Sequence, residues 1–276
     1  MIRFAAYLLP VVALAAVAAM VVFSLEERED STSAPAADEV APAATPTTSR
    51  PRFEPGQTVC QGVLHRADPG QPRVFHPVYT QRETVAGIEV IGGAGVSPEA
   101  FATAKKTIET MFAGNDLAAP LVEEGVYVII AESGQGILDL PEFACLEQQF
   151  GARFFERVCG IADRADYPVA TVNEDDLLGK RSGPCAGLNI LYHELGHVIQ
   201  NWSLGPADWF DIKQYYQDAI TAGAYRGTYA ATNPDEYFAE ATQAYFLRTS
   251  YRTDREWLER RDPKLFTLLE RVYGPR

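Results

Sequence analysis

Two of the four histidines in this 276-residue chain lie in one pentapeptide, His-Glu-Leu-Gly-His at positions 193–197. On a helix, side chains four positions apart share a face, so His193 and His197 present two imidazoles to one point. Tetrahedral zinc accepts such a pair, and Glu194 projects beside that point, where it can take a proton from water. The pentapeptide therefore predicts a helix that carries two metal ligands and a general base. The alternative is an ordinary amphipathic helix with two histidines on its polar edge.

A catalytic zinc site needs a third protein ligand, and the sequence offers one downstream. The remaining histidines, His65 and His76, lie far upstream of the pentapeptide. Glu236 and Glu240 are again four residues apart and would face one way on a helix. This pattern predicts that Glu236 binds the metal and that Glu240 accepts the free N–H of a ligand histidine.

Both carboxylates have a structural alternative. Asn233 lies three residues before Glu236, which is also the spacing of a capping box, where the glutamate would reach back to the backbone. Glu240 could be a solvated helix carboxylate, although its apolar neighbours favour a buried face.

The pentapeptide and the segment Tyr-Ala-Ala-Thr-Asn-Pro-Asp-Glu-Tyr-Phe-Ala-Glu at 229–240 together resemble the catalytic domain of the anthrax lethal factor family. They are also similar to the related Pro-Pro endopeptidases. That family carries a tyrosine seven residues before the ligand glutamate, followed by an aromatic-rich stretch. The resemblance covers residues 185–248 and implies a glutamate-ligand zincin with one zinc ion.

The resemblance also implies a role for each matching residue. It assigns the metal ligands to His193, His197 and Glu236. It assigns the general base to Glu194, the second carboxylate to Glu240 and the family's tyrosine to Tyr229. A phenol hydroxyl can donate to the oxyanion that develops during hydrolysis, whereas the structural alternative for Tyr229 is one surface tyrosine among 13.

The N-terminal residues 1–57 are predicted to form a membrane-directed segment followed by a linker. Residues 4–23 carry no charge, and twenty apolar residues are about what a helix needs to cross a membrane. We therefore expect an N-terminal transmembrane anchor or signal peptide over 1–25, with the remainder outside the cytoplasm. Residues 26–57 are rich in Pro, Ala and Thr and predict a disordered linker. The metallopeptidase domain would then span residues 58–276.

Charge limits the possible partners. The net charge of −13 argues against nucleic-acid binding, which needs a positive face. We expect a peptide or protein substrate, a membrane contact through the N-terminal helix, and a monomer. The four cysteines all follow the apolar run and predict two disulfides, for which three pairings are possible. The short loop favours Cys145–Cys159, which leaves Cys60–Cys185 by elimination.

Strand patterns precede helix patterns along the predicted domain, so the fold class is α+β with a small mixed sheet and a mainly helical C-terminal half. We predict strands at 87–91, 126–130 and 169–172, and a helix that begins after Ser97. Further helices are predicted near 186–202, 207–223, 234–248 and 255–272. The strand at 169–172 is our candidate edge for binding a substrate as an added strand. The acidic residues 174–176 behind it would then favour a basic substrate side chain, or simply form a solvated turn.

These features predict an extracytoplasmic zinc-dependent endopeptidase. Two alternatives stay open at this point: a non-catalytic zinc-containing binding module of the cell envelope, and a zinc amidase that acts on a cell-wall crosslink.

Overall fold

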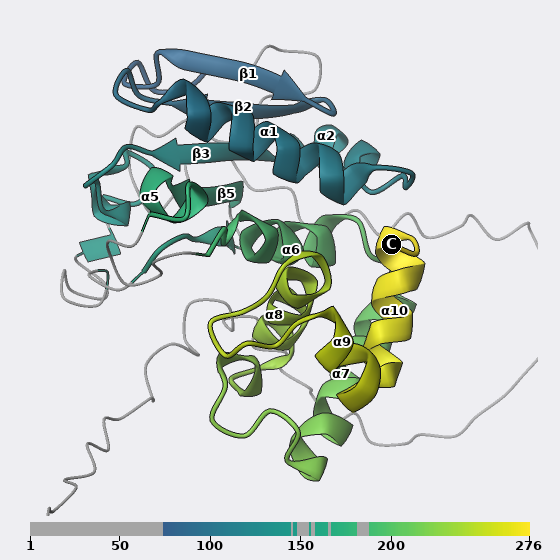
Figure 1. Cartoon of the computed structure of the whole chain (residues 1–276). Helices are drawn as coiled ribbons and strands as arrows, with labels where there is room; N and C mark the ends of the chain where they lie inside the picture. The colour runs from purple at the N-terminus through teal and green to yellow at the C-terminus, as the bar shows by residue number, and fades with distance from the viewer. Residues whose placement is uncertain (1–73, 145, 148–154, 156–157, 165–166, 181–187) are drawn as a thin grey trace, which may run out of the picture.

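The computed structural model describes residues 74–144, 146–147, 155, 158–164, 167–180 and 188–276. Within these residues, the first half combines a sheet with helices and the second half is helical, so the predicted α+β class is confirmed (Figure 1). The described strands are β1 (Gln81–Val85), β2 (Ile88–Gly92), β3 (Tyr127–Ala131), β4 (Ala162–Arg164) and β5 (Tyr167–Asn173).

The strands form one mixed sheet in the order β1-β2-β3-β5-β4. β2, β3 and β5 are parallel, whereas β1 and β4 pair antiparallel at the two ends of the sheet. Our expectation that residues 169–172 form a free edge is therefore wrong. β5 pairs with β3 on one side and with β4 on the other. β4 has only three residues, which is too short for a strand pattern to be recognisable in the sequence.

Both faces of the central strand β3 are buried, which explains its continuous apolar run. Side chains alternate between faces along a strand, so Val128 and Ile130 join the large core under the helices. Tyr127 and Ile129 point to the other face and join a smaller core. That smaller core includes Ile137 of the 3₁₀ turn η2 (Ile137–Asp139).

Several helices begin at a residue whose side chain caps them. α1 (Pro98–Phe112) starts after Ser97, whose Oγ accepts a hydrogen bond from the backbone N–H of Ala100. The other described helices are α2 (Ala118–Glu124), α5 (Glu174–Leu177), α6 (Leu191–Trp202), α7 (Pro206–Ala222), α8 (Pro234–Phe246), α9 (Arg255–Arg261) and α10 (Pro263–Tyr273).

The single helix predicted near 255–272 is wrong, because α9 ends at Arg261 and α10 begins at Pro263. A proline disfavours helical geometry at the residue before it, and Asp262 indeed leaves the helical conformation. Asp262 then caps α10 by accepting a hydrogen bond from the N–H of Leu265.

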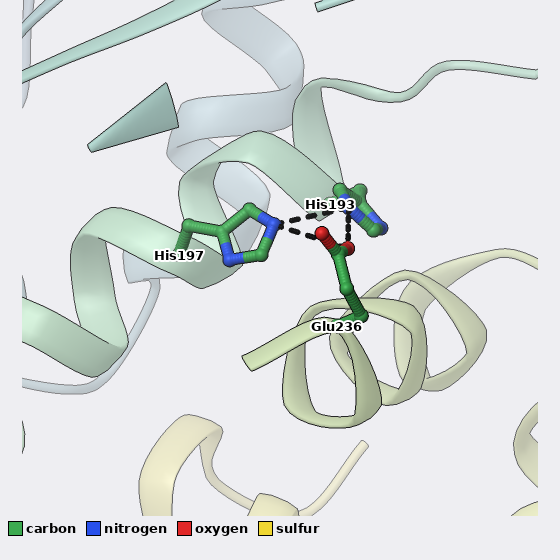
Figure 2. A group of neighbouring side chains, drawn as sticks. All are labelled: His193, His197 and Glu236. Carbon is green, nitrogen blue, oxygen red and sulfur yellow. Dashed lines mark hydrogen bonds and ion pairs between the residues drawn. The ribbon is translucent and has the colours of Figure 1, made fainter. Parts of the chain in front are cut away.

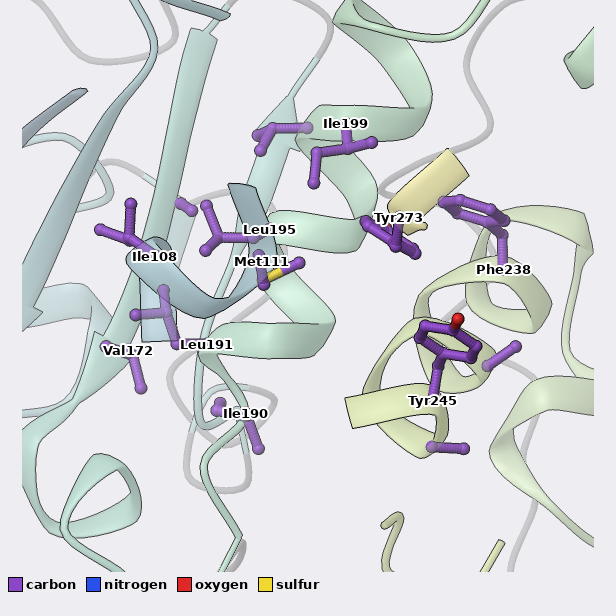
Figure 3. Close-up of a cluster of buried hydrophobic side chains, with 14 of the residues drawn as sticks. Ile108, Met111, Val172, Ile190, Leu191, Leu195, Ile199, Phe238, Tyr245 and Tyr273 are labelled. Carbon is purple, nitrogen blue, oxygen red and sulfur yellow. The ribbon is translucent and has the colours of Figure 1, made fainter. Parts of the chain in front are cut away.

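α6 lies between the sheet and the helical half. One side of α6 places Leu191, Leu195 and Ile199 beside Ile108 and Met111 of α1 (Figure 3). The other side packs on α8, and Gly196 permits this close contact. A Cβ at Gly196 would lie 3.2 Å from Cα of Ala239, so a glycine inside this helix keeps α6 and α8 together.

The predicted membrane location needs correction. None of the helices in the described part of the chain is long and apolar enough to cross a membrane. This finding contradicts the single-pass membrane location. Residues 4–23, like the predicted linker at 26–57 and the domain boundary at residue 58, lie outside the described residues.

Cys159 is buried and forms a disulfide. The other three cysteines, Cys60, Cys145 and Cys185, lie outside the described residues. The connectivity of the two predicted disulfides therefore stays a prediction.

Candidate metal centre

Three side chains from two helices meet at one point: His193 and His197 from α6, and Glu236 from the first turn of α8 (Figure 2). We call this group the donor cluster. One ligand atom from each residue lies within 4.8 Å of the others. The two Nε2 atoms are 3.1 Å apart, so both imidazoles turn the same nitrogen to the centre.

Oε2 of Glu236 faces both imidazoles, at 3.1 Å from Nε2 of His193 and 3.5 Å from Nε2 of His197. This oxygen is buried, yet it has no hydrogen-bond partner of good geometry in the described part of the chain. A buried carboxylate oxygen without a partner is unfavourable unless something else satisfies it. Two imidazole nitrogens and one carboxylate oxygen are the donor set of many catalytic zinc sites, so these residues fit a zinc ion.

Glu236 is available as a ligand because another residue caps α8. Oδ1 of Asn233 accepts hydrogen bonds from the backbone N–H groups of Asp235 (2.9 Å) and Glu236 (2.8 Å). The capping-box alternative would instead direct the Glu236 carboxylate toward the backbone of Asn233. In the structure that carboxylate points to the two histidines and to Tyr229.

Two neighbours hold the donor cluster in place. Oε1 of Glu240, one turn after Glu236, lies 3.4 Å from Nδ1 of His193. Tyr229, in the 3₁₀ turn η3 (Tyr229–Ala231), donates a hydrogen bond of 3.0 Å to Oε1 of Glu236. Burial, together with the charge of Glu236, raises the pKa of Tyr229, so its hydroxyl remains a donor.

Glu194 lies on the same helix as the histidines, and only 6% of it is exposed. Burial raises the pKa of Glu194 to about 6, although the two histidines act in the opposite direction. The pKa of Glu236 shifts the other way. Burial alone would raise this pKa, but the imidazoles of His197 and His193, which face Oε2 of Glu236, hold it below its usual range. The two glutamates thus have different acid–base character within one site.

The structure therefore brings together the six predicted site residues: His193, Glu194, His197, Tyr229, Glu236 and Glu240. It also shows contacts that sequence reasoning missed. Gln200, fully buried on α6, donates a hydrogen bond of 3.0 Å to Asp235 and so joins α6 to α8 beside the donor cluster. Gly196 could have been noticed, because a glycine inside a helix lowers helix stability and usually has a packing reason.

The fold and the site together define a zincin-like α+β domain. It consists of the mixed sheet, the two histidines on α6 and the glutamate on α8. The chain belongs to the anthrax toxin lethal factor family. The family model described as "Anthrax toxin lethal factor, N- and C-terminal domain" matches residues 112–272, which is more than half of the chain. This confirms the predicted family and relates the chain to zinc metalloproteases. Compared with curated proteins one by one, the chain matches none.

Proposed function

We propose that this protein is a zinc-dependent endopeptidase that hydrolyses peptide bonds. The observation that carries the proposal is the convergence of two Nε2 atoms and one unsatisfied carboxylate oxygen, with a second buried carboxylate beside them on the same helix. Membership of the lethal factor family supports it independently. His193, His197 and Glu236 would hold the ion. Zinc would supply a Lewis acid that polarises a substrate carbonyl and makes water more acidic.

Glu194 acts as the general base in this proposal. Its carboxylate takes a proton from the attacking water and later passes the proton to the leaving amine. A carboxyl group with a pKa of about 6 is well suited to both steps near neutral pH.

Tyr229 and Glu240 assist from either side of the donor cluster. Glu240 accepts from Nδ1 of His193, which keeps Nε2 of that imidazole directed to the centre. The Tyr229 hydroxyl, which donates to Glu236 in the structure, turns to the oxyanion as the substrate carbonyl is attacked.

The substrate would add a strand beside β4 rather than beside β5. β4 is the last strand on that side of the described sheet, and α6 packs against it. The segment before β4 continues the pairing, because Cys159 and Ile161 accept hydrogen bonds from the N–H groups of Asn173 and Thr171. Alternate residues of an antiparallel strand point their backbone groups in opposite directions, so we expect the N–H and C=O of Gly160 to pair with the substrate strand.

The test is cleavage of a peptide library by the purified full chain of known zinc content, with and without a chelator. We expect cleavage that the chelator abolishes and added zinc restores. A zinc-containing protein that cleaves no peptide would contradict the proposal. That result would favour a non-catalytic binding role or a non-peptide amide substrate.

A further inference from the structure

Gly160 lies against the proposed general base more closely than any side chain would allow. A Cβ built on Gly160 would lie 2.6 Å from Oε1 of Glu194 and 2.9 Å from its Cδ. The same Cβ would lie 2.5 Å from the backbone carbonyl oxygen of Thr171. Carbon atoms do not approach oxygens so closely in proteins, so the bare backbone at this position forms a wall for the Glu194 carboxylate.

The need for glycine here arises from space and not from backbone conformation. Several described glycines have positive φ angles, which other residues rarely adopt, and Gly160 is not among them. Gly136 offers a contrast. It has a φ of −91°, and a Cβ there would meet no atom closer than 3.7 Å.

The segment that carries Gly160 is fixed on both sides of it. The carbonyl of Cys159 accepts from the N–H of Asn173 (3.2 Å), and that of Ile161 accepts from the N–H of Thr171 (2.9 Å). The N–H of Ile161 also donates to Oγ1 of Thr171 at 2.7 Å. Cys159 is in addition tied by its disulfide. Gly160 therefore cannot move away easily, and Glu194 is the more mobile of its two close neighbours.

We propose that Gly160 is a positioning residue, whose missing side chain leaves the space in which the Glu194 carboxylate is held for catalysis. The segment 159–161, fixed to β5 and by the Cys159 disulfide, supports this wall. The inference rests on the proposed function, because it gives Glu194 the role of general base.

The first test needs no substrate. Gly160→Ala is made in the wild-type chain and in the Glu194→Ala chain, and Gly136→Ala is made in both as the matched control. Thermal unfolding is measured for all variants. We expect Gly160→Ala to lower Tm by about 5 °C in the wild-type background, as overpacking does, and by less when the Glu194 carboxylate is absent. An equal loss in both backgrounds would overturn the proposal, because the methyl group would then conflict with β5 alone.

The second test separates kcat from metal binding. Gly160→Ala should lower kcat on a cleaved peptide about tenfold or more, with KM and zinc content close to those of the wild type. Gly136→Ala should change none of them. Unchanged kcat in a folded Gly160→Ala protein would overturn the proposal. If the wild-type chain cleaves no peptide, the proposed function fails, while the unfolding comparison still decides whether Gly160 positions Glu194.

A third measurement serves if Gly160→Ala does not fold. Hydrogen exchange of the backbone at 158–162 is compared between the wild-type chain and the Glu194→Ala variant. We expect exchange several-fold faster in Glu194→Ala, since the segment loses the carboxylate packed against it. Identical exchange would contradict the close contact on which the proposal depends.

Discussion

Two groups of ionisable side chains can be compared in this structure, and in only one of them do the side chains point to a common centre. The donor cluster directs three ligand atoms to a single point. Glu174, Asp175 and Asp176, which we call the acidic turn, are consecutive residues at the end of β5. Among the described residues, the donor cluster is the group that could hold a metal ion, and the acidic turn is not part of it.

The difference lies in spacing and in counter-charge. Consecutive residues of a helical turn point in different directions, whereas residues four apart share a face. Lys180 also pairs with two of the three carboxylates of the acidic turn, at 3.0 Å from Oδ1 of Asp175 and 3.8 Å from Oε1 of Glu174. The acidic turn is not simply solvated, because Glu174 and Asp176 are buried. Charge density alone therefore does not identify a site, while convergence of unsatisfied atoms does.

The largest effect that this comparison predicts is that of Glu194→Gln. Replacing the proposed base by an uncharged amide should lower kcat/KM about 1,000-fold, while the zinc content stays unchanged. Peptide cleavage and metal analysis of the same preparation measure both quantities. Asp176→Asn, the same chemical change in the acidic turn, is the control and should retain activity. Comparable cleavage by Glu194→Gln and wild type would refute the base assignment.

Glu236→Ala should affect zinc binding itself. Loss of one of three protein ligands should weaken zinc affinity by about 100-fold or more, since even supporting residues contribute about 10- to 100-fold. Competition with a chelator of known affinity measures the change. Glu174→Ala, which removes a carboxylate from the acidic turn, should leave zinc affinity unaltered. If Glu236→Ala retains full zinc affinity, Glu236 is not a ligand.

A smaller loss is expected when Glu240 is changed. Glu240→Ala removes the partner of Nδ1 of His193 and should weaken zinc affinity about tenfold. Glu240→Gln keeps an acceptor oxygen at that position and should lose less. The same competition assay compares the two variants. Equal zinc affinity in Glu240→Ala and wild type would show that the contact does not orient His193.

The smallest effect concerns stability at the acidic turn. Burial, reinforced by the charge of Asp175, raises the pKa of Asp176 from 3.8 to about 6. The folded state therefore holds this proton more tightly than the unfolded chain does, so the stabilisation is complete below pH 4. It is lost as the pH rises through 6. Asp176→Asn should raise the free energy of unfolding at pH 7 by about 1 kcal/mol and remove this part of the pH dependence. Urea unfolding between pH 4 and 7 tests both, and an unchanged pH slope would contradict the shift.

Much of the candidate site could be predicted because it depends on local spacing. His193, His197, Glu236 and Glu240 lie on helices whose periodicity is readable, and the cap at Asn233 marks the start of α8. The two possible roles of Glu236, helix cap and metal ligand, could not be distinguished from the sequence, because both fit the same spacing. The Asn233 side chain alone satisfies both N–H groups, and that is a property of the folded turn.

What could not be predicted depends on contacts between distant segments. The three-residue strand β4 has no readable period, and its place beside β5 changed which strand stands at the edge. The wall at Gly160 is formed by a residue 34 positions before Glu194, and the sequence gives no sign of that approach. The break at Asp262 was missed for a different reason. The apolar spacing continues across it, while proline geometry interrupts the helix.

The two ends of the described sheet differ in how they would meet another molecule. β1 closes the end opposite β4, and its middle residues, Arg82, Glu83 and Thr84, are exposed, with Arg82 paired to Glu89 of β2. Charged side chains on an outer strand hinder pairing with strands of other proteins. The β1 end is therefore protected against accidental aggregation between copies. If substrate peptides pair with β4 as proposed, the opposite end of the same sheet is the one that resists strand pairing.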